Sequence, residues 1–125
     1  MTRQYLQVDL VLDIHATQIA RYGGSPGLRD PGQLDSALHR PRSGYYNDLI
    51  EEAAALWESL SQNHPFVDGN KRTALASTLI FLGLNDYTVS ADSGTLQAFV
   101  TGLYDAGEFK FERLEPWLRE HVKPL

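Results

Sequence analysis

The sequence has no cysteine. This absence excludes a disulfide framework and any metal site built from thiolates, and it is in keeping with a cytoplasmic protein. Basic residues are also in short supply, because 11 Lys and Arg stand against 16 Asp and Glu, for a formal net charge of −5. Broad binding of nucleic acid needs a basic face, so this balance argues against a direct nucleic-acid partner.

Long hydrophobic runs are missing as well. The longest apolar stretch, residues 74–84, includes Ser77, Thr78 and Gly83. It falls short of the roughly 20 residues that cross a bilayer. The N-terminal segment has acidic residues within its apolar part, unlike a signal peptide. The sequence therefore predicts a cytoplasmic protein that makes no contact with a membrane.

The residues that are present can build one core. Of the 125 residues, 42% are hydrophobic and 22% charged, so we expect residues 1–125 to form a single soluble domain. Apolar periodicity and capping signals predict helices over residues 9–21, 31–38, 48–62, 70–84, 92–104 and 112–121. No clear alternation of period two is present, so the predicted fold is all-α. The helix 70–84 is apolar nearly all round and should be buried at the centre of the others.

The segments between these helices are rich in breakers. The stretch 23–27, GGSPG, is interpreted as a helix stop, 40–47 as a loop or short hairpin, and 63–69 as a loop. The scattered His15, His39 and His121 lack the spacing of metal ligands, so a zinc site is not expected. His15, inside the first helix, is interpreted as a structural histidine.

One loop and helix start carry an unusual concentration of polar groups: HPFVDGNKRT, residues 64–73. Lys71 and Arg72 fall in the first turn of the expected central helix. A helix N-terminus already carries partial positive charge and free N–H donors. Cations there are therefore unfavourable unless a bound anion compensates the charge. Gly69 lets the backbone approach a ligand closely. The stretch therefore predicts a phosphate-binding site.

His64 and Asp68 stand just before these cations. Histidine exchanges a proton near neutral pH and can act as a general base on an incoming hydroxyl. A carboxylate such as Asp68 suits Mg²⁺, which typically uses one or two carboxylates together with substrate phosphates. Together these groups predict phosphoryl or nucleotidyl transfer. Each residue alone also has a plainer explanation, as a helix cap, a turn glycine, a packed loop histidine or a solvent-exposed cation.

The stretch HPFVDGNKRTA resembles the signature of the Fic/Doc family, H-x-F-x-[DE]-[GA]-N-[GK]-R. A second block, residues 19–41, is similar to the N-terminal part of the Doc (death-on-curing) branch. The two matches occur in the right order and cover most of the chain. The resemblance implies a single Fic/Doc domain over residues 1–125, with the all-α Fic fold: a helical bundle around a central buried helix that the motif loop precedes.

The resemblance also implies roles for individual residues. His64 would be the catalytic base, Asp68 the ligand of Mg²⁺, and Phe66 an anchor of the loop in the core. The phosphates of the nucleotide substrate, ATP, would be bound by Gly69, Asn70, Lys71 and Arg72. The segment 40–47 corresponds to a flap that docks a target peptide by strand addition. The flap residues would be Arg42, Ser43, Gly44, Tyr45 and Tyr46.

Departures from the family pattern bear on the reaction. Adenylyl-transferring members usually have glycine at the position of Lys71 and a second arginine at the position of Leu75. Both differences favour the Doc-type activity, in which the γ-phosphate of ATP goes to a threonine of elongation factor Tu and translation stops. Gly69 points the other way, because adenylylating members have glycine there and Doc has alanine. AMP transfer to a protein hydroxyl therefore stays open, as does a non-catalytic binding module.

The sequence also lacks the inhibitory motif of many relatives, [ST]-x-x-x-E-[GN], because no Ser or Thr is followed by Glu four residues later. The resemblance then implies inhibition in trans, by a small cognate antitoxin whose disordered segment folds against this chain.

Overall fold

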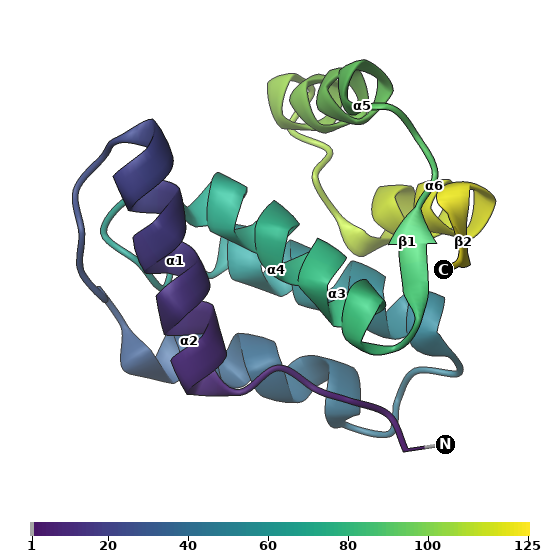
Figure 1. The fold of residues 1–125 in the computed structure, drawn as a ribbon, viewed down its shortest axis with the longest axis horizontal. Helices are drawn as coiled ribbons and strands as arrows, with labels where there is room; N and C mark the ends of the chain where they lie inside the picture. The colour runs from purple at the N-terminus through teal and green to yellow at the C-terminus, as the bar shows by residue number, and fades with distance from the viewer. Residues whose placement is uncertain (1) are drawn as a thin grey trace.

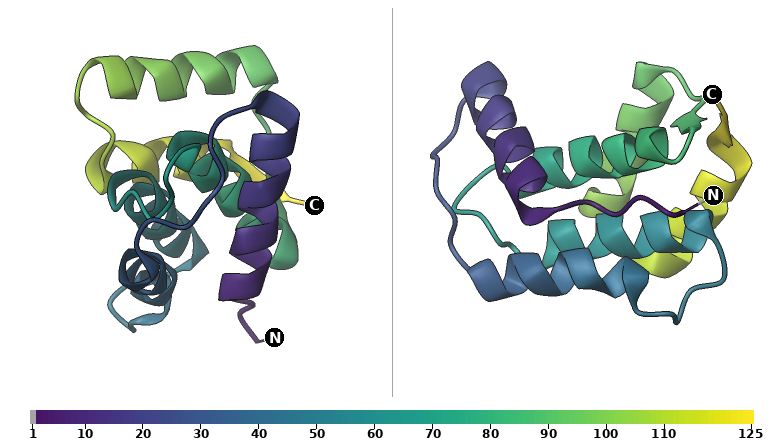
Figure 2. Two further views of the ribbon diagram at one scale, coloured as in Figure 1. Left: turned by 90° about the vertical axis from the view of Figure 1, so that its left-hand side faces the viewer. Right: turned by 60° about the horizontal axis from the view of Figure 1, so that its bottom comes forward.

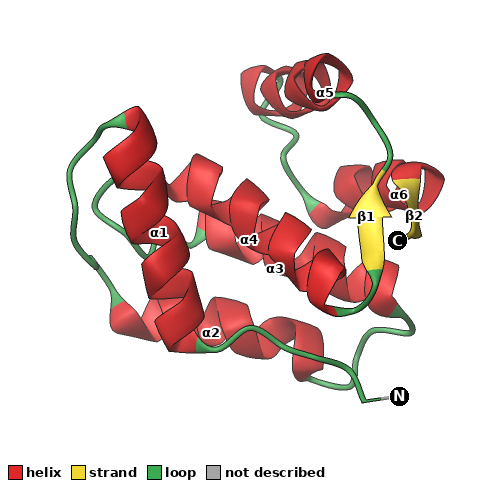
Figure 3. Ribbon diagram, in the orientation of Figure 1, coloured by secondary structure: helices red, strands yellow, loops and turns green. Residues whose placement is uncertain are grey.

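The computed structural model describes residues 2–125. Within them lie six α-helices: α1 (Val8–Tyr22), α2 (Pro31–His39), α3 (Leu49–Gln62), α4 (Asn70–Leu84), α5 (Ser93–Asp105) and α6 (Phe111–His121). A 3-10 helix, η1 (Arg40–Arg42), follows α2. The all-α prediction is confirmed, and each predicted helix is present within a residue or two of its predicted bounds (Figure 3).

A small sheet is the element that the sequence did not predict. Strand β1 (Tyr87–Val89) pairs antiparallel with β2 (Val122–Pro124), with Thr88 opposite Lys123. It ties the segment after α4 to the end of the chain. Strands of three residues are too short to display an alternating pattern, so periodicity could not reveal them.

Three helices begin at an aspartate that caps them. The side chains of Asp30, Asp48 and Asp92 each accept a hydrogen bond from the backbone N–H three residues further on, at 2.8–3.1 Å. Such a cap satisfies one of the N–H groups that a helix start leaves free. Helix α4 begins differently, at Gly69, which has no side chain to offer.

The core lies mainly around α3 and α4, which pack side by side, with α1 against α4 and α2 against α3 (Figures 1 and 2). Helix α3 buries ten residues and α4 buries six. Helix α4 is therefore the central helix, as predicted, but only part of its surface is buried. Leu79 and Ile80 lie on the outer face, 36% and 38% exposed, whereas the inner face buries small or hydroxyl-bearing residues towards its start and two large apolar ones, Phe81 and Leu82, towards its end.

The C-terminal part of the molecule is looser around α5. Figure 1 shows α5 standing apart from α4, while α6 packs on α3. Leu103 is the buried residue of α5. None of the helices in residues 2–125 is long and apolar enough to span a bilayer.

Candidate active site

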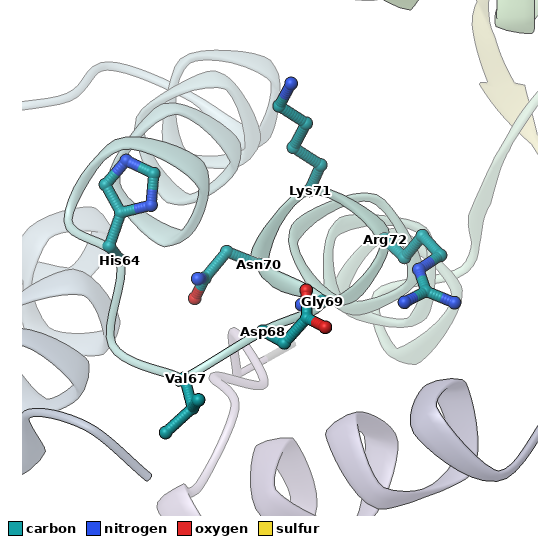
Figure 4. Close-up of a pocket in the computed structure, with 7 residues that line it drawn as sticks. All are labelled: His64, Val67, Asp68, Gly69, Asn70, Lys71 and Arg72. Carbon is teal, nitrogen blue, oxygen red and sulfur yellow. The ribbon is translucent and has the colours of Figure 1, made fainter. Parts of the chain in front are cut away.

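The predicted site residues meet where α3 ends and α4 begins. A hollow of about 500 Å³ lies there, lined by His64, Val67, Asp68, Gly69, Asn70, Lys71 and Arg72. Figure 4 shows the imidazole of His64 on one side and Arg72 on the other, with Asn70 and Gly69 between them. Every residue predicted to act as base, metal ligand or phosphate binder therefore faces one open space.

The N-terminus of α4 is open toward this hollow. Gly69 has a φ of 75°, the left-handed region that favours glycine. The first bond of the helix runs from the Thr73 N–H to the Gly69 carbonyl, 3.0 Å long, so the preceding N–H groups of the first turn have no carbonyl within the helix. These amides and the positive end of the helix dipole suit an anion.

Asp68 is an exposed carboxylate with fixed geometry. Its Oδ2 accepts from the Ser25 N–H at 3.1 Å and its Oδ1 from the Gly69 N–H at 2.8 Å. These backbone bonds, to Ser25 first, lower the pKa of Asp68, so its carboxylate is ionised at neutral pH. Each oxygen keeps a further lone pair for a ligand.

This arrangement fits Mg²⁺ held by one protein ligand. No group of three or more His, Asp or Glu side chains in the described part of the chain could hold a metal ion. Mg²⁺ commonly makes do with one or two carboxylates and completes its shell with substrate phosphates and water. An ionised Asp68 beside an anion-binding helix end meets that requirement.

The glycine-rich stretch after α1 does more than end a helix. Gly24 lies against Asp68, with a φ of 112°, and a Cβ on it would be only 2.7 Å from Oδ2 of Asp68. The backbone of residues 24–25 can therefore reach the carboxylate only because residue 24 is glycine. The interpretation of 23–27 as a simple helix stop was incomplete.

The segment that follows holds the motif loop like a neighbouring strand. Leu28 forms a bridge with Phe66, and the Pro65 carbonyl accepts from the N–H groups of Arg29 and Asp30 at 2.8 and 3.0 Å. The Arg29 side chain also donates from Nε to the His64 carbonyl at 2.7 Å. His64 has a φ of 49°, unusual for a residue other than glycine. Arg29 helps to hold it there.

Phe66 anchors the loop in the core, as predicted, at 2% exposure. The Asn70 side chain brackets it, donating to the Phe66 carbonyl and accepting from its N–H, both at 3.0 Å. His15 stacks on the Phe66 ring at 3.8 Å, and its Nε2–H donates to the Asp68 carbonyl at 2.8 Å. His15 is buried, as a structural histidine should be, but its contacts serve the motif loop.

The two cations at the start of α4 rest on aromatic rings. Nη2 of Arg72 donates to the Gly23 carbonyl at 2.9 Å, and its guanidinium lies 5.6 Å from the centre of the Tyr22 ring. Nζ of Lys71 lies 4.3 Å from the centre of the Tyr104 ring. Neither cation takes part in the ion pairs of residues 2–125. Both charges are therefore available to an anionic ligand.

The predicted flap lies outside this hollow. Residues 40–42 form η1 and residues 43–48 form bends and coil, so the alternative of a hairpin is wrong. Arg40 holds the segment by donating to Glu58 at 2.6 Å and to the Tyr46 hydroxyl at 2.7 Å. These bonds tie the segment to α3, and Tyr45 beside it is 81% exposed. The hollow's lining includes none of residues 42–46.

The sequence was also compared with protein families and with known proteins. The model of the Fic/DOC family matches residues 5–82. Over 76 residues the chain is 45% identical to "Toxin Doc" of Mycolicibacterium smegmatis, a match that covers 57% of this chain and 58% of that protein. Over 108 residues it is 34% identical to "Protein kinase doc" of Escherichia phage P1, covering 74% of this chain and 86% of that protein.

Proposed function

This chain belongs to the Fic/Doc family, and on that basis we propose that it is a Doc-like toxin that transfers the γ-phosphate of ATP to a hydroxyl of a translation factor. The observation that carries the proposal is the single hollow that gathers His64, Asp68, Lys71 and Arg72 at the open end of α4. A base, a hard carboxylate and an anion-binding helix end are the parts that phosphoryl transfer needs.

Each of these groups has a role in the proposed reaction. The imidazole of His64 takes the proton of the target hydroxyl, whose oxygen forms a bond to the γ-phosphorus as the bond to the β-phosphate oxygen breaks and ADP leaves. Lys71, Arg72 and the first-turn amides of α4 hold the charged phosphates and the charge that spreads over them. Asp68 would hold Mg²⁺, which when bound neutralises phosphate charge.

Two residues favour phosphate transfer over AMP transfer. Lys71 adds a cation where adenylylating relatives have glycine, and Leu75 replaces their second arginine with a half-buried apolar side chain. The phage P1 relative is called a protein kinase. AMP transfer is the second candidate because Gly69, in its left-handed conformation, is the residue that adenylylating relatives carry at this position.

The partners follow from the same proposal. The target would be a translation factor similar to elongation factor Tu, and its modification would arrest translation. A cognate antitoxin would inhibit the toxin in trans, because the chain carries no inhibitory motif of its own.

A labelling experiment tests the reaction. The protein is incubated with Mg²⁺, purified elongation factor Tu and ATP labelled at either the γ- or the α-phosphate. We expect the γ label to be transferred and the α label to stay in solution. Transfer of the α label would replace the kinase proposal with AMP transfer.

The variant His64→Ala separates an enzyme from a binding module. We expect it to abolish transfer and growth inhibition while circular dichroism shows an unchanged helical fold. His39→Ala, at the exposed end of α2, is the matched control and should keep full activity. Growth inhibition that survives His64→Ala would favour a non-catalytic module that sequesters its partner.

A further inference from the structure

The contact between Lys71 and Tyr104 joins the start of α4 to α5. The ammonium lies over the ring, 4.3 Å from its centroid, and the face of an aromatic ring attracts a cation through its quadrupole. Helix α5 otherwise stands apart from α4 (Figure 1). The ring therefore defines where the charge of a long, flexible side chain lies.

Tyr104 is itself held from two directions. Its hydroxyl is 2.6 Å from Oγ of Ser61, which is buried in the last turn of α3. Its ring stacks on the buried Phe109 at 4.3 Å, with the two planes only 2° apart. Because Phe109 covers one face of the ring, Lys71 takes the other. The ammonium of Lys71 therefore lies on a ring that buried residues hold in place from its other side.

The ring acts on Lys71 as a neutral phenol. Burial raises the pKa of Tyr104, and the hydrogen bond with Ser61 opposes this only in part. The attraction therefore comes from the ring face and not from a phenolate. It leaves the ammonium's N–H donors free for an anion, because Lys71 takes part in none of the ion pairs of residues 2–125.

Lys71 stands at the boundary of two hollows. It lines the site of about 500 Å³ and also a second hollow of about 300 Å³ between α4 and α5, where Leu75, Val100 and Tyr104 form part of the wall. Were the ring absent, the side chain could lean into that second space, away from His64. The ring keeps it at the edge of the site.

We propose that Tyr104 is a positioning residue, which holds the ammonium of Lys71 at the rim of the site, oriented for the anionic group of the substrate. A side chain ordered beforehand loses less rotamer freedom when the ligand binds, and that saving appears as affinity. The identity of this anion as the phosphates of ATP rests on the proposed function, whereas the placement of Lys71 does not.

The first test reads the placement of Lys71 without any ligand. The chain has three lysines, Lys71, Lys110 and Lys123, so a spectrum of lysine labelled with carbon-13 is easily assigned. Ring current should shift the ε-methylene protons of Lys71 upfield in the wild type and in Tyr104→Phe, and the shift should vanish in Tyr104→Leu. Tyr87→Leu, on β1, is the control and should leave it unchanged. An unshifted Lys71 signal in the wild type would overturn the proposal.

The second test is a double-mutant cycle on ATP binding, measured by calorimetry. We expect Tyr104→Leu to weaken binding about two- to tenfold, the effect of the rotamer freedom that a long side chain loses when a ligand immobilises it, and Tyr104→Phe to weaken it much less. In a Lys71→Met background Tyr104→Leu should have no further effect. Equal losses in both backgrounds would show a merely structural role and overturn the proposal. Should Tyr104→Leu fail to fold, Tyr104→Met fills the same space without a ring face.

Inorganic triphosphate, used in the same cycle, separates this inference from the proposed function. The protein could bind triphosphate but not ATP, with coupling between Tyr104 and Lys71. That result would support the positioning role of Tyr104 and contradict ATP as the ligand. Absence of binding by both anions to the wild type would remove both proposals.

Discussion

Helices α3 and α4 pack side by side, yet their N-termini are built in opposite ways. At α3 the Asp48 side chain caps the helix, Glu51 and Glu52 occupy the first turn, and Arg119 binds the cap at 3.0 Å. At α4 a left-handed Gly69 leaves the end uncapped, and Lys71 and Arg72 add positive charge to an end that is already positive. The N–H groups and positive charge at the start of α3 find partners within the protein. Those at the start of α4 find theirs only when an anion binds.

The largest effect should come from removing the two cations of α4. We expect the double variant Lys71→Gln with Arg72→Gln to lower the rate of the proposed phosphate transfer by about a hundredfold or more, as for other groups that stabilise developing charge. The melting temperature should change little, because the loss of two charges from the positive end of a helix is stabilising, whereas the contacts of Lys71 with Tyr104 and of Arg72 with Gly23 are lost.

Arg119→Gln, beside the N-terminus of α3, is the matched control and should keep full transfer activity. Retained transfer in the double variant would contradict the assignment of Lys71 and Arg72. A large fall in its melting temperature would show that these cations serve the fold.

Gly69→Ala tests the uncapped start of α4. A φ of 75° costs a residue with a Cβ about 1–2 kcal/mol, and the new Cβ would lie 3.1 Å from Cδ1 of Ile19. We expect the free energy of unfolding, measured in urea, to fall by at least this amount. Gly44→Ala is the control, because Gly44 has a φ of 86° and nothing within 4 Å of an added Cβ.

The difference between these two variants measures the contact with Ile19. Adding Ile19→Val to Gly69→Ala should recover part of the loss. An equal loss in Gly69→Ala and Gly44→Ala would show that Ile19 moves aside at no cost.

Asp48→Ala should show the reverse pattern at α3. Loss of a helix cap costs about 1 kcal/mol of unfolding free energy, and the exposed pair with Arg119 adds little. The transfer rate of the folded protein should not change, since Asp48 lies far along α3 from the site. Asp35→Ala, an exposed residue within α2, is the control. A transfer rate that falls by more than the unfolded fraction explains would contradict this expectation. It would show that the N-terminus of α3 affects the site at the N-terminus of α4.

The smallest effect concerns pH. The hydrogen bond from Arg119, followed by backbone bonds, lowers the pKa of Asp48 below its ordinary value of 3.8. A depressed pKa in the folded state gives stability that is full above the ordinary value and is lost as the pH falls through the lower one. The free energy of unfolding is measured in urea between pH 6 and pH 3. Below about pH 4 it should fall less steeply with decreasing pH in Asp48→Asn than in the wild type. Identical slopes would contradict the shift.

The helices could be predicted because their signals are local. Asp30 with Pro31, Asp48 and Asp92 each mark a helix start within a few residues, and the structure confirms all three. Which face of α4 is buried could not be predicted in this way. Its apolar residues lie nearly all round, and which of them face solvent depends on where α1, α3 and α5 pack.

The candidate site was predictable for the same local reason, because its residues lie within 64–72. The residues that support it were not: His15, Gly24 and Arg29 contact Asp68 and His64 from 35 to 53 positions away. The block 19–41 held Gly24 and Arg29, and it indicated the family without indicating their contacts. The flap prediction rests on the resemblance alone and stays a prediction, while Arg40 ties that segment to α3 through Glu58.

The sequence by itself determined the helical fold, the open and positively charged start of α4, and the set of groups that such a start needs. These features depend on neighbours in the chain, where capping, helix dipole and backbone freedom act over one or two turns. Only the tertiary structure decided what holds each group in place: Gly24 against Asp68, Arg29 on the His64 carbonyl, and Tyr104 beneath Lys71. Those contacts join segments far apart in sequence, and they exist because the segment between α1 and α2 and the Tyr104 side chain of α5 reach the motif loop and the start of α4.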